Sequence, residues 1–118
     1  MRTGVDLIEI SRIGQTLAEH GERFQRRVFT AAEWRLCGGR PAALAGRWAA
    51  KEAAAKALGC GIGDVAWLEI EILNDARGAP ILRLHGAAAR LAAELGLDQW
   101  TISLSHSRDL AIALVIAY

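Results

Sequence analysis

An alanine-rich segment at residues 48–59, WAAKEAAAKALG, constrains the fold of this chain more than any other. Ala, Leu, Glu and Lys favour helix, and Gly59 is suited to the left-handed conformation that ends one. At about 100° per residue, the apolar residues of this part of the chain fall on one stripe, which consists of Leu44, Trp48, Ala55 and Leu58. The segment therefore predicts a central helix with one buried stripe, and its alanines would let other backbone approach closely.

Glu52 lies at the edge of this stripe, and Lys56 lies one turn further along the same row. One interpretation is an ordinary surface ion pair, which stabilises a helix by about 0.2–0.5 kcal/mol. Another follows from composition, because the chain has 14 basic residues and the only lysines among them are Lys51 and Lys56. The pKa of a lysine can fall on burial, so that it releases a proton, whereas arginine keeps its charge. Lysine at this position is therefore also consistent with a proton donor.

The length of 118 residues and the hydrophobic content of 53% predict one folded domain over residues 1–118 and exclude disorder. No apolar run is long enough to span a membrane, and the first residues lack the basic-then-apolar layout of a signal peptide. Cys37 and Cys60 belong to no metal or redox motif, so neither a disulfide scaffold nor a zinc site is expected. These features predict a protein of the reducing cytoplasm.

Positive charge is concentrated in the N-terminal half, although the formal net charge is only +1. Residues 1–60 carry ten Lys and Arg against six Asp and Glu, whereas residues 61–118 carry four against seven. An anionic partner would therefore contact the first half. Nucleic acid is not expected to be that partner, because the net charge is low and no nucleic-acid-binding motif is present.

Capping residues and periodicity predict the other elements. Ser11 is suited to be the N-cap of a helix that ends near Gly21, and Thr30 and Glu33 have capping-box spacing for a short helix through Cys37. Pro41 suits the first turn of the central helix, and residues 87–95 form a second alanine-rich helix. Strands are expected at residues 3–8, 68–72, 80–84, 100–105 and 110–117. This order predicts an α+β fold, with an antiparallel sheet packed against helices.

Two longer motifs stand at residues 4–13, GVDLIEISRI, and at residues 47–59, RWAAKEAAAKALG. Between them lies the RVFTxxEW stretch of residues 27–34, and a Gly-x-Pro turn follows at residues 78–80. In these segments and in their spacing the chain resembles the holo-acyl-carrier-protein synthases, and the resemblance covers essentially the whole chain. It implies the 4'-phosphopantetheinyl transferase fold.

The resemblance also implies a reaction. The 4'-phosphopantetheine arm of coenzyme A moves to a serine of apo acyl carrier protein and releases adenosine 3',5'-bisphosphate, a step that supports fatty acid biosynthesis. Breaking the pyrophosphate bond calls for a metal on the phosphates, and Mg²⁺ commonly takes one or two carboxylates. The implied ligands are Asp6 and Glu52, although Asp6 alone would equally suit a turn or a cap. Lys56 is implied to neutralise or protonate the departing phosphate. The resemblance does not identify the general base that accepts the serine proton, and a metal-held water linked to Glu52 is one candidate.

Binding residues follow from the same resemblance. For coenzyme A they are Arg47, Lys56, Pro80 and His106, although a lone histidine after a strand is more often structural. The glycine-rich residues 59–63 follow a helix rather than opening one, so they are a weak signal for a phosphate cradle. For the acidic acyl carrier protein, the implied contacts are Arg12, Arg23 and Arg27. Without the resemblance, these arginines would be interpreted as an ordinary basic surface exposed to solvent.

Two other functions fit part of this pattern. Asp6, Glu52 and Lys56 would also suit a Mg²⁺-dependent hydrolase of a nucleotide. The arginines of the first half would suit a non-catalytic module that docks acidic proteins. The first would consume coenzyme A without a carrier protein, and the second would bind a carrier regardless of Mg²⁺ and coenzyme A.

The last predicted strand, LAIALVIA at residues 110–117, is apolar on both faces, and strands of this kind are normally covered on both sides. The helices of so short a chain can cover one face well. A neighbouring subunit is therefore expected on the other face, unless loops of the same chain suffice. The resemblance implies a homotrimer with each active site between two subunits.

Overall fold

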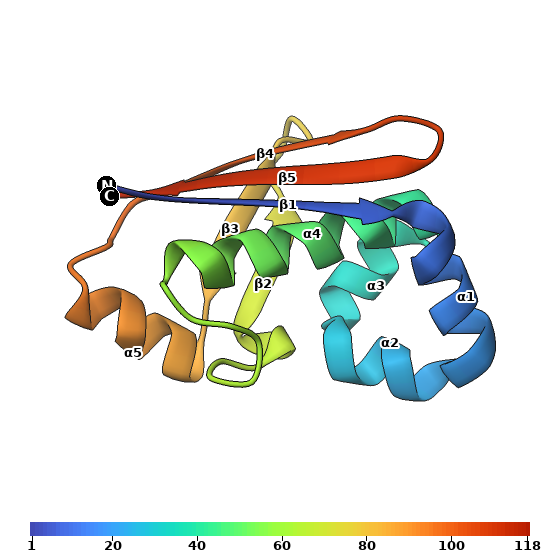
Figure 1. Ribbon diagram of the computed structural model, residues 1–118, viewed down its shortest axis with the longest axis horizontal. Coiled ribbons are helices and arrows are strands. Elements are labelled where there is room, and N and C mark those ends of the chain that lie inside the picture. The colour runs from blue at the N-terminus through green and yellow to red at the C-terminus, as the bar shows by residue number, and fades with distance from the viewer.

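The computed structural model describes residues 1–118, and Figure 1 shows the order of its elements. The helical elements are α1 (Ile10–His20), α2 (Glu22–Val28), α3 (Ala31–Cys37), α4 (Pro41–Ala57), the 3₁₀ turn η1 (Trp67–Glu69) and α5 (Gly86–Glu94). The strands are β1 (Arg2–Glu9), β2 (Ile70–Asn74), β3 (Pro80–Leu84), β4 (Trp100–His106) and β5 (Leu110–Ala117).

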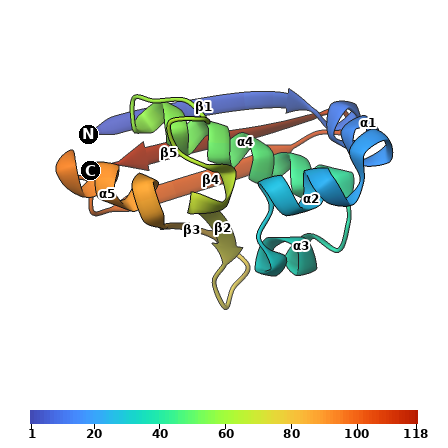
Figure 2. The ribbon, with the colours of Figure 1, turned by 90° about the horizontal axis from the view of Figure 1, so that it is seen from below.

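The strands form two antiparallel sheets rather than the single sheet predicted. One has three strands in the order β1-β5-β4, and the other is the β2–β3 hairpin. Figure 1 shows all the helices on one side of the three-stranded sheet, and Figure 2 shows α4 running along it. The hairpin is not hydrogen-bonded to the three-stranded sheet, although β3 lies against β4, and β2 packs against α3 and α4. The predicted α+β class, with antiparallel strands packed against helices, is confirmed.

The central helix α4 is buried on almost all sides, so the predicted single apolar stripe is wrong. The three-stranded sheet packs against one side of α4, and α3 and β2 pack against another. A helix covered all round need not be amphipathic. Most of its side chains are small, which lets both layers approach its backbone, and its buried residues are Leu44, Ala45, Gly46, Arg47, Ala49, Ala50, Lys51, Ala53, Ala54, Ala55 and Ala57.

The predicted ends of α4 are confirmed, since Pro41 opens the helix and Gly59, with φ of 77°, lies just beyond its last turn. The capping box of α3 is also confirmed. The Glu33 N–H donates to Thr30 Oγ1 at 3.1 Å, and the Thr30 N–H donates to Glu33 Oε1 at 2.9 Å. All these signals are local in sequence, which is why the sequence predicts them.

The predicted start of α1 is wrong, although the helix ends at Gly21 as expected. Ser11 is not its N-cap, because α1 begins at Ile10 directly after β1 and no side chain caps it. The Ile10 N–H instead donates to the Asp109 carbonyl at 2.8 Å. The turn between β4 and β5 therefore satisfies this N–H group in place of a cap.

Strand β2 starts at Ile70, two residues later than the alternating pattern predicts, because Trp67–Glu69 form η1. The carboxylate of Glu69 holds this turn by accepting from the Ala66 N–H at 2.7 Å and from the Ala87 N–H near the start of α5. These backbone bonds favour the ionised form and lower the pKa of Glu69. Glu69 therefore links η1 to α5, a contact between distant residues that alternation does not reveal.

The two faces of β5 differ in exposure. Its inner residues Ala111, Ala113, Val115 and Ala117 are buried, and α4 packs against this strand. The outer face of the sheet, defined here as Val5, Leu7, Leu110, Ile112 and Leu114, has side chains between 38% and 57% exposed. Val5 pairs with Leu114 and Leu7 with Ile112, so these side chains form one apolar surface. The chain thus covers only one face of the sheet, as predicted, and a subunit on the other stays a prediction.

None of the helices combines the length and the apolar character needed to cross a membrane. Both cysteines are free, with Cys37 buried and Cys60 partly exposed. Burial raises the pKa of each thiol above its ordinary value. Neither cysteine is therefore activated as a nucleophile.

Candidate active site

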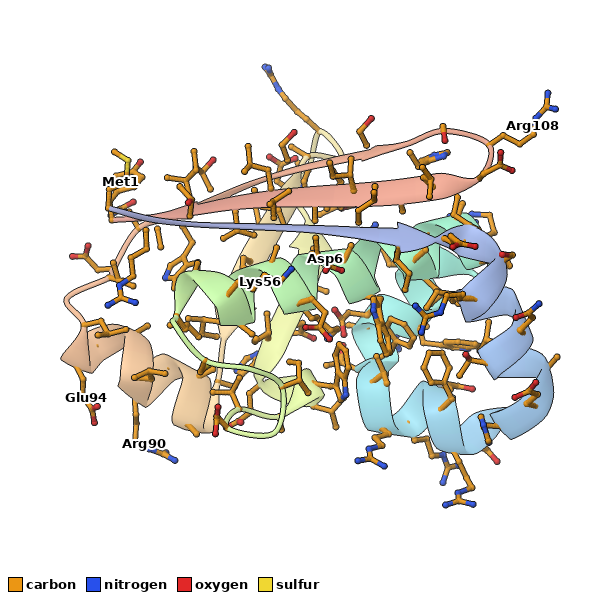
Figure 3. All side chains as sticks on the ribbon, in the orientation of Figure 1. Met1, Asp6, Lys56, Arg90, Glu94 and Arg108 are labelled. Atoms are coloured by element: carbon orange, nitrogen blue, oxygen red, sulfur yellow. The ribbon has the colours of Figure 1, made fainter.

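Asp6 and Lys56 meet where the edge strand β1 lies against α4, although 50 positions separate them in the chain (Figure 3). Lys56 Nζ lies 3.2 Å from Asp6 Oδ1 and donates to the Val5 carbonyl at 2.9 Å. The side chain of Lys56 is nevertheless 53% exposed. Its ammonium group is therefore fixed beside a carboxylate and stays accessible to a further anionic group.

Gly4 allows the close approach of β1 to α4. A Cβ atom at Gly4 would overlap the Ala53 carbonyl oxygen and would lie 3.0 Å from the Ala57 backbone nitrogen. Only a residue without a Cβ fits so closely against a helix backbone. Because side chains alternate along a strand, Asp6 shares the Gly4 face of β1 and is brought toward α4. This confirms the close backbone approach predicted from the alanines.

Gly4→Ala is expected to lower the free energy of unfolding by about 1–3 kcal/mol, the usual cost of overpacking. The added methyl group would push β1 away from α4. Urea denaturation followed by circular dichroism measures the change. The matched control is Gly14→Ala in α1, where nothing lies within 4 Å of the new Cβ and alanine stabilises a helix by about 0.5–1 kcal/mol. If Gly4→Ala is as stable as the wild type, β1 does not pack in this way.

Glu52 is partly buried on α4, one turn before Lys56. Burial raises the pKa of Glu52, the nearby Asp6 carboxylate raises it further, and Lys56 opposes both effects. Lys56 forms its ion pair with Asp6 and none with Glu52, so the interpretation of Glu52 and Lys56 as a surface pair is wrong. Two carboxylates therefore share one site with a single lysine, and a further cation would favour the ionised form of Glu52.

This site suits a cation that needs few protein ligands. The chain contains no group of three or more His, Cys, Asp or Glu side chains that could hold a metal ion. Mg²⁺ commonly uses one or two carboxylates and completes its coordination with phosphate oxygens and water. The excess negative charge of Asp6 and Glu52 fits that mode, in which a substrate phosphate would supply further oxygens.

Arg47 is 9% exposed and lies one turn before Lys51 on α4. Its Nη2 donates to Asn74 Oδ1 at 2.9 Å, while its Nε has no hydrogen-bond partner. Asn74 pairs with Pro80 across the β2–β3 hairpin. The structure thus places Arg47 and Pro80 at the same end of the hairpin. The sequence does not predict Asn74 as a partner of Arg47, although a polar residue at the end of an apolar strand can indicate a side chain with such a role.

No hydrogen bond or ion pair connects the side chain of His106 to Asp6, Lys56 or Arg47. His106 is exposed at the end of β4, and the one hydrogen-bond contact of its side chain is between Nδ1 and the Ser107 carbonyl at 3.2 Å. The glycine-rich residues 59–63 are also unsuited to hold phosphate, because four of their N–H groups already have partners in the chain. Gly59 donates to Lys56 O, Cys60 to Ala55 O, Gly61 to Asp64 Oδ2 and Gly63 to Val65 O.

The three arginines predicted to bind a carrier protein are all exposed, Arg12 on α1 and Arg23 and Arg27 on α2. Arg23 and Arg27 line a surface hollow of about 310 Å³ together with His20 and Phe24, whereas Arg12 lies outside it. The sequence prediction omitted His20 and Phe24, although a phenylalanine between arginines was a signal. A cationic hollow that contains an aromatic ring suits an acidic partner with an apolar side chain.

The second lysine, Lys51, is fully buried and forms an ion pair with Glu33 at 2.8 Å. The sequence prediction missed this pair, although the count of lysines had singled out Lys51. The compact ammonium group of lysine, with its three donors, fits a closed space better than a guanidinium group does. Burial lowers the pKa of Lys51 and Glu33 opposes this effect, but all three N–H donors are used within the chain, so Lys51 has a structural role and donates no proton to a substrate.

Comparison with known proteins gives matches over nearly the whole chain. Residues 2–115 match the family model of the 4'-phosphopantetheinyl transferase superfamily. A holo-[acyl-carrier-protein] synthase of Herpetosiphon aurantiacus is 58% identical over an alignment of 121 positions, which covers 97% of this chain and 95% of that protein. The crystal structure of Helicobacter pylori holo-[acyl-carrier-protein] synthase in complex with coenzyme A is similar with a TM-score of 0.90 and 29% identity, covering 98% of this chain and 99% of that one. The crystal structure of a holo-(acyl-carrier-protein) synthase from Bacillus anthracis, in complex with CoA (3',5'-ADP), is similar with a TM-score of 0.80 and 35% identity. The match covers 98% of this chain and 94% of that one.

Proposed function

This chain belongs to the 4'-phosphopantetheinyl transferase superfamily, and from this premise we propose that it is a holo-acyl-carrier-protein synthase. It transfers 4'-phosphopantetheine from coenzyme A to a serine of apo acyl carrier protein and releases adenosine 3',5'-bisphosphate. The observation that carries the proposal is the meeting of Asp6, Glu52 and Lys56 where β1 crosses α4. The reaction is proposed to support fatty acid biosynthesis in the cytoplasm, and residues 1–118 are proposed to form one domain.

Asp6 and Glu52 are the residues proposed to hold Mg²⁺. When bound, the ion would neutralise charge on the pyrophosphate of coenzyme A and polarise the phosphorus centre. Neither carboxylate acts as the nucleophile, because the attacking hydroxyl belongs to the carrier protein. Glu52 is also the residue proposed to accept the serine proton, through a water molecule.

Lys56 is proposed to face the pyrophosphate. Two partners, the Val5 carbonyl and Asp6, fix its ammonium group, and an ammonium has three N–H donors. The remaining donor is free to contact a phosphate oxygen. Lys56 can then stabilise the charge that develops on the departing bisphosphate and can donate a proton to it.

Lys56→Arg is expected to lower the turnover number by about tenfold or more, since removing a general acid costs at least that much. Arginine keeps the positive charge but does not release a proton at accessible pH. Binding of coenzyme A should therefore stay close to that of the wild type. Steady-state kinetics and isothermal titration calorimetry measure the two effects. Equal turnover would mean that Lys56 acts only as a charge.

The nucleotide part of coenzyme A is proposed to bind near Arg47 and Pro80, with His106 as a further phosphate contact. The positive charge of Arg47 suits the phosphates of coenzyme A, although its Nε, which lacks a partner within the chain, is itself buried. Asn74 orients Arg47 through its side-chain oxygen. Variants of Asn74 are therefore expected to weaken coenzyme A binding indirectly.

Acyl carrier protein is proposed to dock on the exposed arginines Arg12, Arg23 and Arg27. Charge reversal by Arg23→Glu is expected to raise the Michaelis constant for the carrier by about tenfold at low salt. It should also weaken the salt dependence of that constant, because attraction between exposed charges is screened by salt. The matched control is Arg90→Glu on α5, at the other end of the molecule from α2 (Figures 1–3). An unchanged Michaelis constant for the carrier in Arg23→Glu would place the docking surface elsewhere.

A homotrimer with active sites between subunits is proposed from the resemblance to the holo-acyl-carrier-protein synthases, and the position of the site supports a subunit beside it. On β1, Val5 and Leu7 point to the exposed outer face, and Asp6 between them points toward α4. A subunit that covers the outer face would therefore lie beside the site. Asp6, Glu52 and Lys56 do not line the main surface hollows of the single chain, and a neighbouring subunit is proposed to complete the coenzyme A site.

Incubation with coenzyme A and Mg²⁺ in the absence of carrier protein tests the proposal against nucleotide hydrolysis, which the same three side chains would allow. A transferase leaves coenzyme A intact in this experiment, because its nucleophile is missing. Liquid chromatography of the nucleotides distinguishes the outcomes. Release of adenosine 3',5'-bisphosphate without a carrier would favour a hydrolase.

A further inference from the structure

The buried ion pair of Lys51 and Glu33 lies on the side of α4 that faces away from β1. At about 100° per residue, Lys51 and Ala53 point to opposite sides of the helix. Ala53 contacts Gly4 of β1, whereas Lys51 reaches α3, η1 and β2. Glu52 stands between these two directions, so the rotation of α4 about its axis sets where the Glu52 carboxylate lies relative to Asp6.

Every polar atom of this pair is hydrogen-bonded. The three N–H donors of the Lys51 ammonium reach Glu33 Oε1 at 2.8 Å, the Trp67 carbonyl at 3.0 Å and the Ile70 carbonyl at 2.6 Å. Both oxygens of Glu33 accept a backbone bond, Oε1 from the Thr30 N–H and Oε2 from the Ile72 N–H, each at 2.9 Å. Both side chains are 0% exposed. A fully satisfied network of this kind permits one arrangement of α4 relative to α3, η1 and β2.

Apart from Trp48, whose ring centroid lies 4.2 Å from that of Trp67 in η1, the rest of α4 offers few large side chains that would define this arrangement. Its buried residues next to Lys51 are mostly alanines, whose short side chains give few interlocking contacts and would tolerate small rotations or shifts of the helix. A buried ion pair is weak evidence for net stability, because desolvation of both charges offsets much of their attraction. The directional bonds of Lys51 therefore matter more for the placement of α4 than for the total stability of the protein. Arg47 adds one further bond, to Asn74.

We propose that Lys51, held by Glu33, is a positioning residue for the reaction: it fixes the rotation and the axial position of α4, so that Glu52 and Lys56 face Asp6. This inference rests on the proposed function for its kinetic consequence. A displacement of about 1 Å at a reacting group can cost about a hundredfold in rate. Loosening α4 should therefore impair the chemical step more than the docking of the carrier, which takes place on α1 and α2.

The test compares the neutral double variant Lys51→Met/Glu33→Gln with Leu44→Ala, which removes a fully buried side chain from the same helix but keeps the ion pair. Both variants lose stability, so melting temperatures are recorded and all assays are run well below them. The double variant is expected to lose about tenfold or more in turnover number while the Michaelis constant for the carrier changes by less than about twofold. Leu44→Ala is expected to keep its turnover number within about twofold of the wild type.

Binding of Mn²⁺, measured by electron paramagnetic resonance in the presence of coenzyme A, gives a readout that does not depend on transfer. The double variant is expected to bind Mn²⁺ about tenfold more weakly than Leu44→Ala does. Equal turnover and equal Mn²⁺ affinity in the two variants would overturn the proposal. If the double variant does not fold, the neutral pair Lys51→Gln/Glu33→Gln, which leaves no unpaired buried charge, takes its place under the same criteria. A wild type that transfers nothing would contradict the proposed function, whereas the Mn²⁺ affinities still decide this inference.

Discussion

Replacing Asp6 or Glu52 by alanine is expected to reduce phosphopantetheine transfer by at least about a hundredfold at limiting Mg²⁺. Each substitution removes one of the two carboxylates proposed to hold the metal and leaves negative charge on the pyrophosphate uncompensated. The proteins should still fold, because neither side chain belongs to the buried core. In Asp6→Ala, Lys56 also keeps its bond to the Val5 carbonyl. Initial rates across a range of Mg²⁺ concentrations, with circular dichroism as the check on folding, measure the effect.

Two controls accompany this measurement. Glu94→Ala removes an exposed carboxylate from α5 (Figure 3) and is expected to leave the rate unchanged. Chelation by EDTA is expected to stop transfer by the wild type, and added Mg²⁺ to restore it. The assignment of Asp6 and Glu52 as metal ligands would be wrong if either alanine variant worked at nearly the wild-type rate in limiting Mg²⁺.

Ile112→Glu is expected to convert the assembly into monomers and to remove activity, although every proposed catalytic residue stays in place. Ile112 lies in the outer face, opposite Leu7, and is 39% exposed in the single chain. A carboxylate there would be forced into an apolar interface without a partner, which is strongly unfavourable. Loss of the neighbouring subunit would then open the site beside Asp6. Multi-angle light scattering gives the mass of the assembly, and the transfer assay gives its activity.

Leu68→Glu is the matched control, since Leu68 is 41% exposed on η1, outside the outer face. This variant should remain assembled and active, which separates burial at an interface from the general effect of a new surface charge. A folded and active monomer of Ile112→Glu at the assay concentration would rule out the proposed assembly.

The sequence predicts those parts of the fold that depend on neighbouring residues. The capping box of Thr30 and Glu33, Pro41 at the start of α4 and Gly59 beyond its end are all local signals, and all are found. The start of α1 was predicted wrongly for the opposite reason. The Ile10 N–H is satisfied by a carbonyl of the distant turn between β4 and β5, so no cap residue is needed.

The candidate site was only partly predictable. The motifs indicated Asp6, Glu52 and Lys56, but the contact between Asp6 and Lys56 depends on the crossing of β1 over α4 at Gly4. The ion pair of Lys51 and Glu33 spans 18 positions and is completed by carbonyl groups of η1 and β2. No periodic pattern reports such contacts, because they arise only when α3, α4 and β2 pack together.

The central claim is tested most directly by mass spectrometry of an apo acyl carrier protein after incubation with this protein, coenzyme A and Mg²⁺. The account predicts that the carrier gains one phosphopantetheine group on a serine and that an equal amount of adenosine 3',5'-bisphosphate appears. A carrier whose serine is replaced by alanine should gain nothing. An unmodified apo carrier, in the presence of folded and assembled protein, Mg²⁺ and coenzyme A, would contradict the proposed function.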